Sequence, residues 1–191
     1  DYFSLDVGNN WGVPSYIPIG SYPEGHWAAL CGEVKAATHL PVVYVGRVAK
    51  PDTAEAILAA GHADLVGAAR ALIADPRFLA KAAAGQRDTI RPCIGVNECI
   101  NRQMVEGLTF ACAVNPYAGR EGGGELAAVV AARRVLVVGG GPAGMELAGL
   151  AAERGHEVTL WERNDWLGGQ LHVAAKLRMN ARYAEWIAWQ A

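Results

Sequence analysis

The sequence contains no apolar segment of the roughly 18 residues that a membrane-spanning helix requires, and it has no dense basic block. Its 17 lysines and arginines are offset by 19 aspartates and glutamates, which gives a formal net charge of −2. A chain that is 52% hydrophobic and 19% charged has the composition of an ordinary soluble domain. Near-neutral charge provides no electrostatic footprint for nucleic acid or an anionic membrane, so we expect neither as a partner.

The sequence also lacks an initiating methionine and a signal peptide. It opens on residues 1–7, which are rich in strand formers, and we expect a chain that begins inside a strand to be a piece of a longer protein. Without an export signal we expect a cytoplasmic location, where clustered cysteines indicate metal binding rather than disulfides. The 191 residues suffice for one large domain or two small ones.

Alternating strands and helices are predicted over the first 90 residues. The predicted strands are 2–7, 41–45 and 63–67, and the predicted helices are 27–38, 52–60 and 77–84. This alternation indicates βαβ units in a parallel sheet. A glycine- and proline-rich loop is predicted over residues 8–25, and long loops of this kind are usually functional.

Two arginines stand just past predicted strands at equivalent positions, Arg47 and Arg70. In a barrel of βα units this end of the strands carries the active site and often a phosphate group. Gly46 allows close backbone approach to an anion, and arginine offers forked donors. The pattern predicts a phosphate site at Gly46, Arg47, Ala69 and Arg70. The alternative is that both arginines are ordinary solvated loop residues.

A second pattern begins near residue 133. The predicted elements are a strand over 133–138, a helix over 145–153 and a strand over 157–161. Between the first two, Gly139, Gly141 and Gly144 match G-x-G-x-x-G, and Glu162 follows the second strand. This context predicts a dinucleotide turn, with the glycines admitting a pyrophosphate and Glu162 accepting hydrogen bonds from a ribose. Gly169, in a later glycine pair, is expected beside the same ligand. The alternative is a turn without a ligand.

Three of the four cysteines, Cys93, Cys99 and Cys112, lie within residues 91–121. Thiolates are the usual ligands of iron–sulfur clusters, which several cysteines must reach together. A zinc site is a second possibility, although the spacing lacks a C-x₂-C pair. The fourth cysteine, Cys31, lies on the apolar side of a predicted helix and is expected to be a small buried thiol.

Residues 26–121 resemble the end of the flavin barrel and the cluster loop of the trimethylamine dehydrogenase and 2,4-dienoyl-CoA reductase group. This group is a branch of the old yellow enzyme (NADH:flavin oxidoreductase) family. The segments that carry the resemblance are Val45–Arg47, Ala63–Arg70, Ile73–Pro76, Arg91–Gly95 and Cys112–Pro116. The glycine-rich turn and residues 167–171 fit the nucleotide domain that follows the cluster in that family.

The resemblance implies an α/β fold in four parts. These are the C-terminal part of an FMN-binding TIM (β/α)8 barrel over 1–90, an iron–sulfur loop over 91–121, a linker over 122–132 and the start of a Rossmann-like FAD/NAD(P)/ADP-binding domain over 133–191. It implies FMN with its phosphate on Gly46, Arg47 and Arg70. It also implies a [4Fe–4S] cluster on the cysteine loop and ADP or FAD on the glycine-rich turn.

Two positions depart from the family pattern. Val96 stands where the family has a fourth cysteine, three residues after Cys93. Valine cannot ligate iron, so a [3Fe–4S] cluster, a cluster completed by water or an outside group, and an empty site are all open. Trp11 is the candidate wall of an aromatic substrate pocket, where ring faces attract a cationic amine. Gln103 replaces the second tryptophan expected there, which argues against trimethylamine itself.

The resemblance therefore implies an FMN- and iron–sulfur-dependent oxidoreductase. We expect it to oxidise a methylated or primary amine and to pass electrons singly through the cluster to a carrier of the electron-transfer flavoprotein type. The alternative is an NAD(P)H-dependent enoate or 2,4-dienoyl reductase of the same architecture. A non-catalytic nucleotide-binding remnant is the alternative of another class. A homodimer is expected, and the proton-transfer residues are expected outside this chain.

Overall fold

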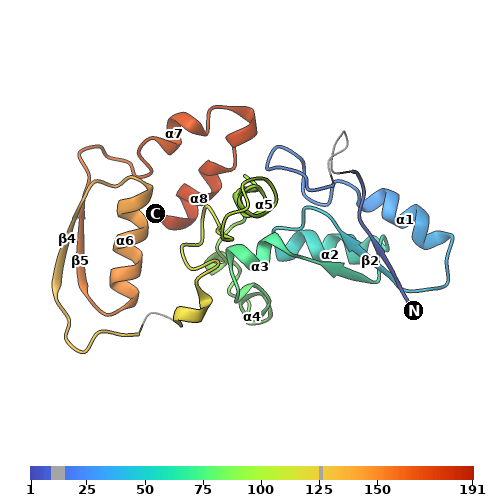
Figure 1. The fold of residues 1–191 in the computed structure, drawn as a ribbon, viewed down its shortest axis with the longest axis horizontal. Helices are drawn as coiled ribbons and strands as arrows, with labels where there is room; N and C mark the ends of the chain where they lie inside the picture. Colours follow the sequence, from blue (N-terminus) through green and yellow to red (C-terminus); the bar gives the residue numbers. More distant parts are fainter. Residues whose placement is uncertain (10–15, 125–126) are drawn as a thin grey trace. The chain divides into compact units, whose positions relative to one another are not determined.

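The computed structural model describes residues 1–9, 16–124 and 127–191. The chain divides into two compact units, Asp1–Ala118 and Gly119–Ala191, which are considered separately below (Figure 1). Trp11 lies outside the described residues, as do positions 125 and 126 of the predicted linker. Within the described part of the chain, no helix combines the length and apolarity needed to cross a bilayer.

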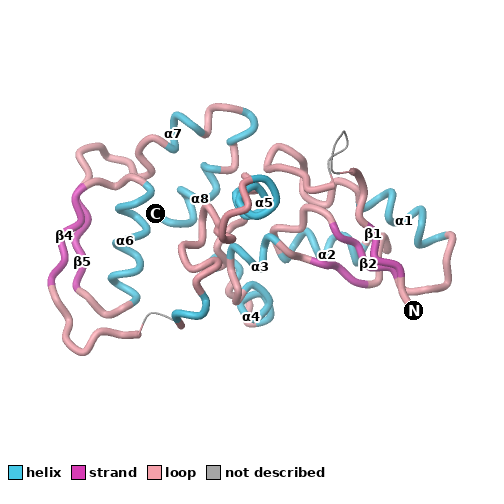
Figure 2. Tube along the Cα trace, viewed as in Figure 1, coloured by secondary structure: helices cyan, strands magenta, loops and turns pink. Residues whose placement is uncertain are grey.

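The first unit contains a three-stranded parallel sheet in the order β1-β2-β3. Its strands and the helices between them are β1 (Phe3–Leu5), α1 (Ala28–Ala36), β2 (Val42–Val45), α2 (Pro51–Ala59) and β3 (Leu65–Gly67). Figure 2 shows the strands in magenta and the helices between them in cyan. The parallel βαβ arrangement predicted from the apolar runs is confirmed.

The central strand β2 supplies the core of this unit. Val42 and Tyr44 are almost fully buried on one face of it. They pack with Ala28 and Cys31 of α1 and with Ile57 of α2. Cys31 is 1% exposed, so the prediction of a small buried thiol is confirmed. Because β2 and β3 pair in parallel, their carboxyl ends lie at one edge of the sheet.

The rest of the first unit is helical and irregular. Its elements are α3 (Arg70–Ala74), α4 (Phe78–Ala83), η1 (Arg87–Thr89), α5 (Glu98–Ile100) and the π-helical turn η2 (Asn101–Val105). Asp75, 5% exposed, connects α4 to the cysteine loop. Its carboxylate accepts hydrogen bonds from Lys81 Nζ at 2.6 Å, from the Arg77 backbone N–H at 2.9 Å and from that of Arg91 at 3.0 Å.

The second unit is built on two parallel strands joined by a helix. Its elements are η3 (Glu121–Gly123), β4 (Arg134–Val138), α6 (Pro142–Glu153), β5 (Glu157–Trp161), α7 (Leu171–Ala174), η4 (Arg178–Asn180) and α8 (Tyr183–Gln190). The register pairs Arg134 with Glu157 and Val138 with Trp161. The predicted start of the helix at position 145 is wrong by three residues. Helix α6 begins at Pro142, because proline at the first helical position has its φ already set and lacks an N–H that would be unsatisfied.

Candidate functional site

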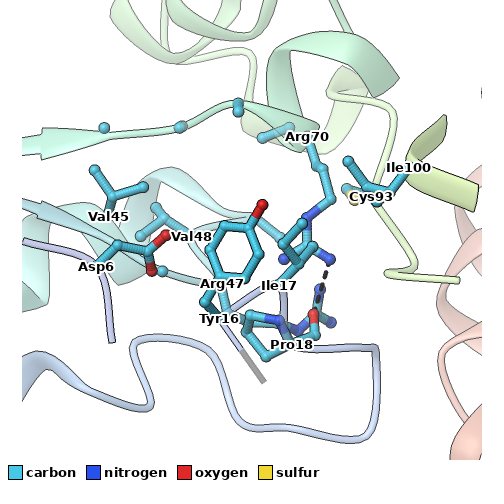
Figure 3. A pocket seen from close by; sticks show the side chains of 16 residues that line it. Asp6, Tyr16, Ile17, Pro18, Val45, Arg47, Val48, Arg70, Cys93 and Ile100 are labelled. Atoms are coloured by element: carbon cyan, nitrogen blue, oxygen red, sulfur yellow. Dashed lines mark hydrogen bonds between the residues drawn. The ribbon is translucent and has the colours of Figure 1, made fainter. Parts of the chain in front are cut away.

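A cavity of about 210 Å³ lies at the carboxyl ends of β2 and β3 in the first unit. All four residues predicted to bind a phosphate group line it, namely Gly46, Arg47, Ala69 and Arg70. Figure 3 labels the two arginines among the lining residues. We call this space the anion cavity. The two strand ends therefore bring together two arginines that are 23 positions apart in the sequence.

Arg47 is 4% exposed and has a backbone φ of 48°. A residue with a side chain adopts this left-handed conformation at a cost of about 1 kcal/mol, and it persists where neighbouring contacts hold it. Here the Arg47 carbonyl accepts a hydrogen bond from Gly25 N–H at 3.1 Å, and Arg47 Nε donates to the Tyr22 carbonyl at 3.3 Å. The loop before α1 thus fixes both the backbone and the side chain of this arginine.

The turn at Gly46 is held by a buried side chain of the same strand. The hydroxyl of Tyr44 donates to the Gly46 carbonyl at 2.7 Å and accepts from the Trp27 backbone N–H at 3.2 Å. Tyr44 is 1% exposed, and its hydrogen bond to Gly46 is buried. The tyrosine therefore couples the backbone that precedes Arg47 to the first residue before α1.

Arg70 begins α3 and is oriented by two acceptors. Its Nη1 donates to the Pro18 carbonyl at 2.8 Å, drawn as a dashed line in Figure 3, and to Asn97 Oδ1 at 2.5 Å. Pro18 belongs to the long loop predicted to be functional, and Asn97 to the cysteine loop. Neither residue was predicted from the sequence to contribute to this site.

The anion cavity also contains one carboxylate. Asp6, which follows β1, lines it, and partial burial raises the pKa of this carboxyl while a hydrogen bond from Val7 N–H and the charge of Arg70 oppose the rise. Two guanidinium groups and one carboxyl group leave the cavity net positive. This balance favours a bound anion.

The three cysteines of the 91–121 loop converge on a second cavity, of about 20 Å³. Cys93, Cys99 and Cys112 line it together with Val96. Cys99 is 6% exposed, and burial raises its pKa, as do the neighbouring Cys112 and Cys93. Among the residues that the structure describes, no three His, Cys, Asp or Glu side chains are arranged to hold a single metal ion. Cys93 also lines the anion cavity.

The cysteine loop passes directly against Arg47 at Gly95. Gly95 has a φ of 69°, and a Cβ there would lie 2.6 Å from Arg47 Nη1 and 2.8 Å from the nitrogen of Gly20. The Gly20 N–H donates to the Gly95 carbonyl at 2.8 Å. A side chain at this position would separate the loop from the arginine.

In the second unit the glycine-rich turn connects β4 to α6. A Cβ on Gly144 would lie 1.9 Å from the Gly139 carbonyl oxygen, so only glycine allows the helix to approach the strand this closely. The predicted acid lies at the same turn, where Glu162 Oε2 accepts from Gly140 N–H at 2.7 Å. Backbone hydrogen bonds from Asn164 and Gly140 lower the pKa of Glu162.

The later glycine pair packs on this turn. Gly168 N–H donates to the Gly140 carbonyl at 2.8 Å. Gly169 has a φ of 50°, and a Cβ there would lie 3.1 Å from Gly141 Cα. The pair therefore lies beside the turn, and its contact with a ligand stays a prediction.

Two family models match the chain. Residues 23–89 match the NADH:flavin oxidoreductase / NADH oxidase family, and residues 134–189 match the FAD dependent oxidoreductase family. The chain is 44% identical over 181 residues to the N,N-dimethylglycine/sarcosine dehydrogenase of Chromohalobacter salexigens. The match covers 93% of this chain and 26% of that protein. It is 42% identical over 165 residues to the NADH oxidase of Thermoanaerobacter brockii, and this match covers 85% of this chain and 25% of that protein.

The chain belongs to the NADH:flavin oxidoreductase / NADH oxidase family. A solved complex of 2-naphthoyl-CoA reductase with 2-naphthoyl-CoA is similar in structure, with a TM-score of 0.89 and 32% identity. That match covers 99% of this chain and 29% of the other. This member of the NADH:flavin oxidoreductase family thus spans about a quarter of the length of the relatives it matches.

Proposed function

We propose that the protein containing this chain is an FMN- and iron–sulfur-dependent oxidoreductase that oxidises a methylated or primary amine. The observation that carries the proposal is that Arg47, Arg70 and Cys93 line one cavity. The residues assigned to the flavin and the first residue assigned to the cluster therefore meet at one place. When bound, FMN supplies the acceptor of two electrons from the substrate, and the cluster supplies a one-electron outlet.

The anion cavity fits the phosphate end of FMN. Its paired guanidinium groups provide forked donors, and Gly46 lets the backbone approach the ligand. Both hydrogen bonds that Arg70 donates within the described residues start from Nη1, so Nε and Nη2 are available to a phosphate. In this proposal Gly46, Arg47, Ala69 and Arg70 hold the anion, and the adjoining strand ends support the rest of the flavin as the C-terminal part of a TIM barrel.

The cysteine loop fits an iron–sulfur cluster in its donor chemistry. Three thiols converge, and thiolates are the ligands such clusters use. The cavity that these thiols line has a volume of about 20 Å³. Val96 lines the same cavity. Because valine cannot ligate iron, this favours three protein ligands, as in a [3Fe–4S] cluster or one completed by an outside ligand.

The glycine-rich turn of the second unit is proposed to bind the pyrophosphate of ADP or FAD. Gly141 directly precedes the first turn of α6, a helix of 12 residues whose N-terminal N–H groups attract anions. Glu162 and Gly169 lie beside this turn. Glu162 is proposed to accept hydrogen bonds from a ribose, as expected of an acid at the end of the second strand.

The likeness to an enzyme that oxidises methylated glycines supports an amine as the substrate. The likeness to a reductase of an aromatic CoA ester supports the second candidate, an NAD(P)H-dependent enoate or 2,4-dienoyl reductase. In the first case electrons leave to a carrier protein, and in the second they arrive from NAD(P)H. A homodimer is proposed for either case.

Spectroscopy of the full-length protein tests the proposal. We expect a flavin band, together with about three or four irons and about four acid-labile sulfides per chain, typical of a cysteine-ligated cluster. Under anaerobic conditions, sarcosine or dimethylamine should bleach the flavin band without NADPH. Bleaching by NADPH alone would instead favour the reductase. A colourless protein without iron would leave the non-catalytic remnant as the explanation.

A further inference from the structure

Asn97 belongs to the cysteine loop and contacts Arg70, which lines the anion cavity. Its Oδ1 accepts from Arg70 Nη1 at 2.5 Å, and its Nδ2 donates to the Ile17 carbonyl at 3.0 Å. One amide therefore connects three segments that are far apart in the sequence. It joins the loop of residues 16–20, the start of α3 and the turn between Cys93 and Cys99.

The backbone at Asn97 is held in an uncommon conformation. Its φ is 59°, and within the described residues Arg47 and Asn97 are the two non-glycine residues with positive φ. Asparagine tolerates the left-handed region better than most residues, yet glycine would occupy it without cost. Arg47 lines the anion cavity, and Asn97 lines the cysteine cavity and accepts a hydrogen bond from Arg70, which lines both. Backbone strain of this kind persists where the side chain has a task that glycine could not perform.

The task is visible in the contacts of Arg70. An arginine side chain has four rotatable torsions, and holding it in one geometry costs side-chain entropy. The Pro18 carbonyl and the Asn97 amide oxygen both engage Nη1, which fixes the plane of the guanidinium group. The neutral amide orients Arg70 and leaves its positive charge intact. A carboxylate at the same position would neutralise that charge.

We propose that Asn97 is a positioning residue that orients Arg70 toward the phosphate of the flavin. The inference depends on the proposed function, since it assumes that Arg70 binds that phosphate. In this proposal Asn97, a residue of the cysteine loop, contributes to flavin binding. Any movement of this loop then changes the orientation of Arg70.

The test compares FMN with riboflavin, which lacks the phosphate, in the full-length protein stripped of flavin. Asn97→Gly removes the amide and relaxes the positive φ. We expect it to weaken FMN binding about tenfold, the value of one hydrogen bond to a charged group, and to leave riboflavin affinity within about twofold. Asn97→Asp keeps the shape but pairs a carboxylate with Arg70, so it should weaken FMN binding further. Asn101→Ala is the matched control, because its amide donates to Glu106.

Arg70→Met distinguishes a failure of the proposed flavin site from a failure of the positioning role of Asn97. If Arg70→Met and Asn97→Gly both weaken FMN binding selectively, the proposal stands. If Arg70→Met does so while Asn97→Gly does not, or if Asn97→Gly and Asn97→Asp weaken FMN and riboflavin equally, the positioning role is wrong and the flavin site remains. If Arg70→Met leaves FMN binding unchanged, the proposed flavin site itself is wrong, and the role of Asn97 with it.

Discussion

The Tyr44 hydroxyl lies 2.7 Å from the Gly46 carbonyl oxygen, two residues further along the same chain. This hydrogen bond closes the end of β2 into the turn that precedes Arg47. Tyr44→Phe leaves the Gly46 carbonyl and the Trp27 N–H without their buried partner. We expect the free energy of unfolding to fall by about 1–3 kcal/mol, the cost of unsatisfied buried groups. Chemical denaturation of the full-length protein measures this, with the exposed Tyr2→Phe as the control; equal midpoints for both variants would contradict it.

Arg47→Lys should weaken FMN binding by about tenfold, because an ammonium group cannot reproduce the fork of a guanidinium. The long side chain and the positive charge are kept, so the fold should be little affected. Flavin fluorescence titration measures the affinity, and Arg87→Lys on the exposed surface serves as the control. An affinity equal to that of the unaltered protein would show that Arg47 does not bind the phosphate.

Asp75 should make the stability of the protein sensitive to acid. Burial raises its pKa, but the hydrogen bonds from Lys81, Arg91 and Arg77 together outweigh this and lower it below 3.8. Because the folded pKa lies below the unfolded one, the stabilisation is fully present above about pH 4 and is lost as the pH falls through the folded pKa. Thermal unfolding between pH 7 and pH 3 measures this loss.

Asp75→Asn is expected to cost about 2 kcal/mol at pH 7, since hydrogen bonds to charged groups are the stronger ones. It should also flatten the acid dependence. Asp88→Asn, at an exposed position of η1, is the control. A melting temperature for Asp75→Asn that equals the control at pH 7 would rule out a stabilising role for the buried carboxylate.

Val96→Cys should supply a fourth thiol to the cavity already lined by Cys93, Cys99 and Cys112. We expect iron to rise from about three toward about four per chain while acid-labile sulfide stays at about four, with the electron paramagnetic resonance signal changing accordingly. Cys112→Ala should lower both contents. Unchanged iron in Val96→Cys would show that position 96 is not a ligand position.

Two glycines of the second unit should respond differently to alanine. Gly144→Ala places a methyl group 1.9 Å from the Gly139 carbonyl oxygen, so the unit should lose stability by about 1–3 kcal/mol or more. Gly141→Ala meets no atom within 4 Å and should fold normally, yet it should weaken ADP binding because a pyrophosphate can no longer approach the backbone. Calorimetric titration with ADP and thermal unfolding distinguish the two effects.

The parallel sheet could be predicted because β-branched runs are typical of buried parallel strands. The placement of Arg47 and Arg70 at one site could be predicted because each follows the end of such a strand. The contacts of Ile17, Pro18 and Tyr22 could not be predicted, because each residue contributes a backbone carbonyl, a group that every residue type carries. Asn97 carried a weak signal, as a residue tolerant of positive φ between two cysteines. The start of α6 at Pro142 was missed although proline favours the first helical turn, because the prediction followed the glycines instead.

The absence of a side chain at Gly95 has a consequence for how this molecule can vary. The tolerance of position 95 is set by its own positive φ, by the backbone of Gly20 and by the guanidinium group of Arg47, a residue 48 positions earlier. Even a single methyl group at this position would push the cysteine loop away from Arg47 at the end of β2. A saturation library at this codon would therefore measure how large a side chain the backbone conformation and these two contacts together allow.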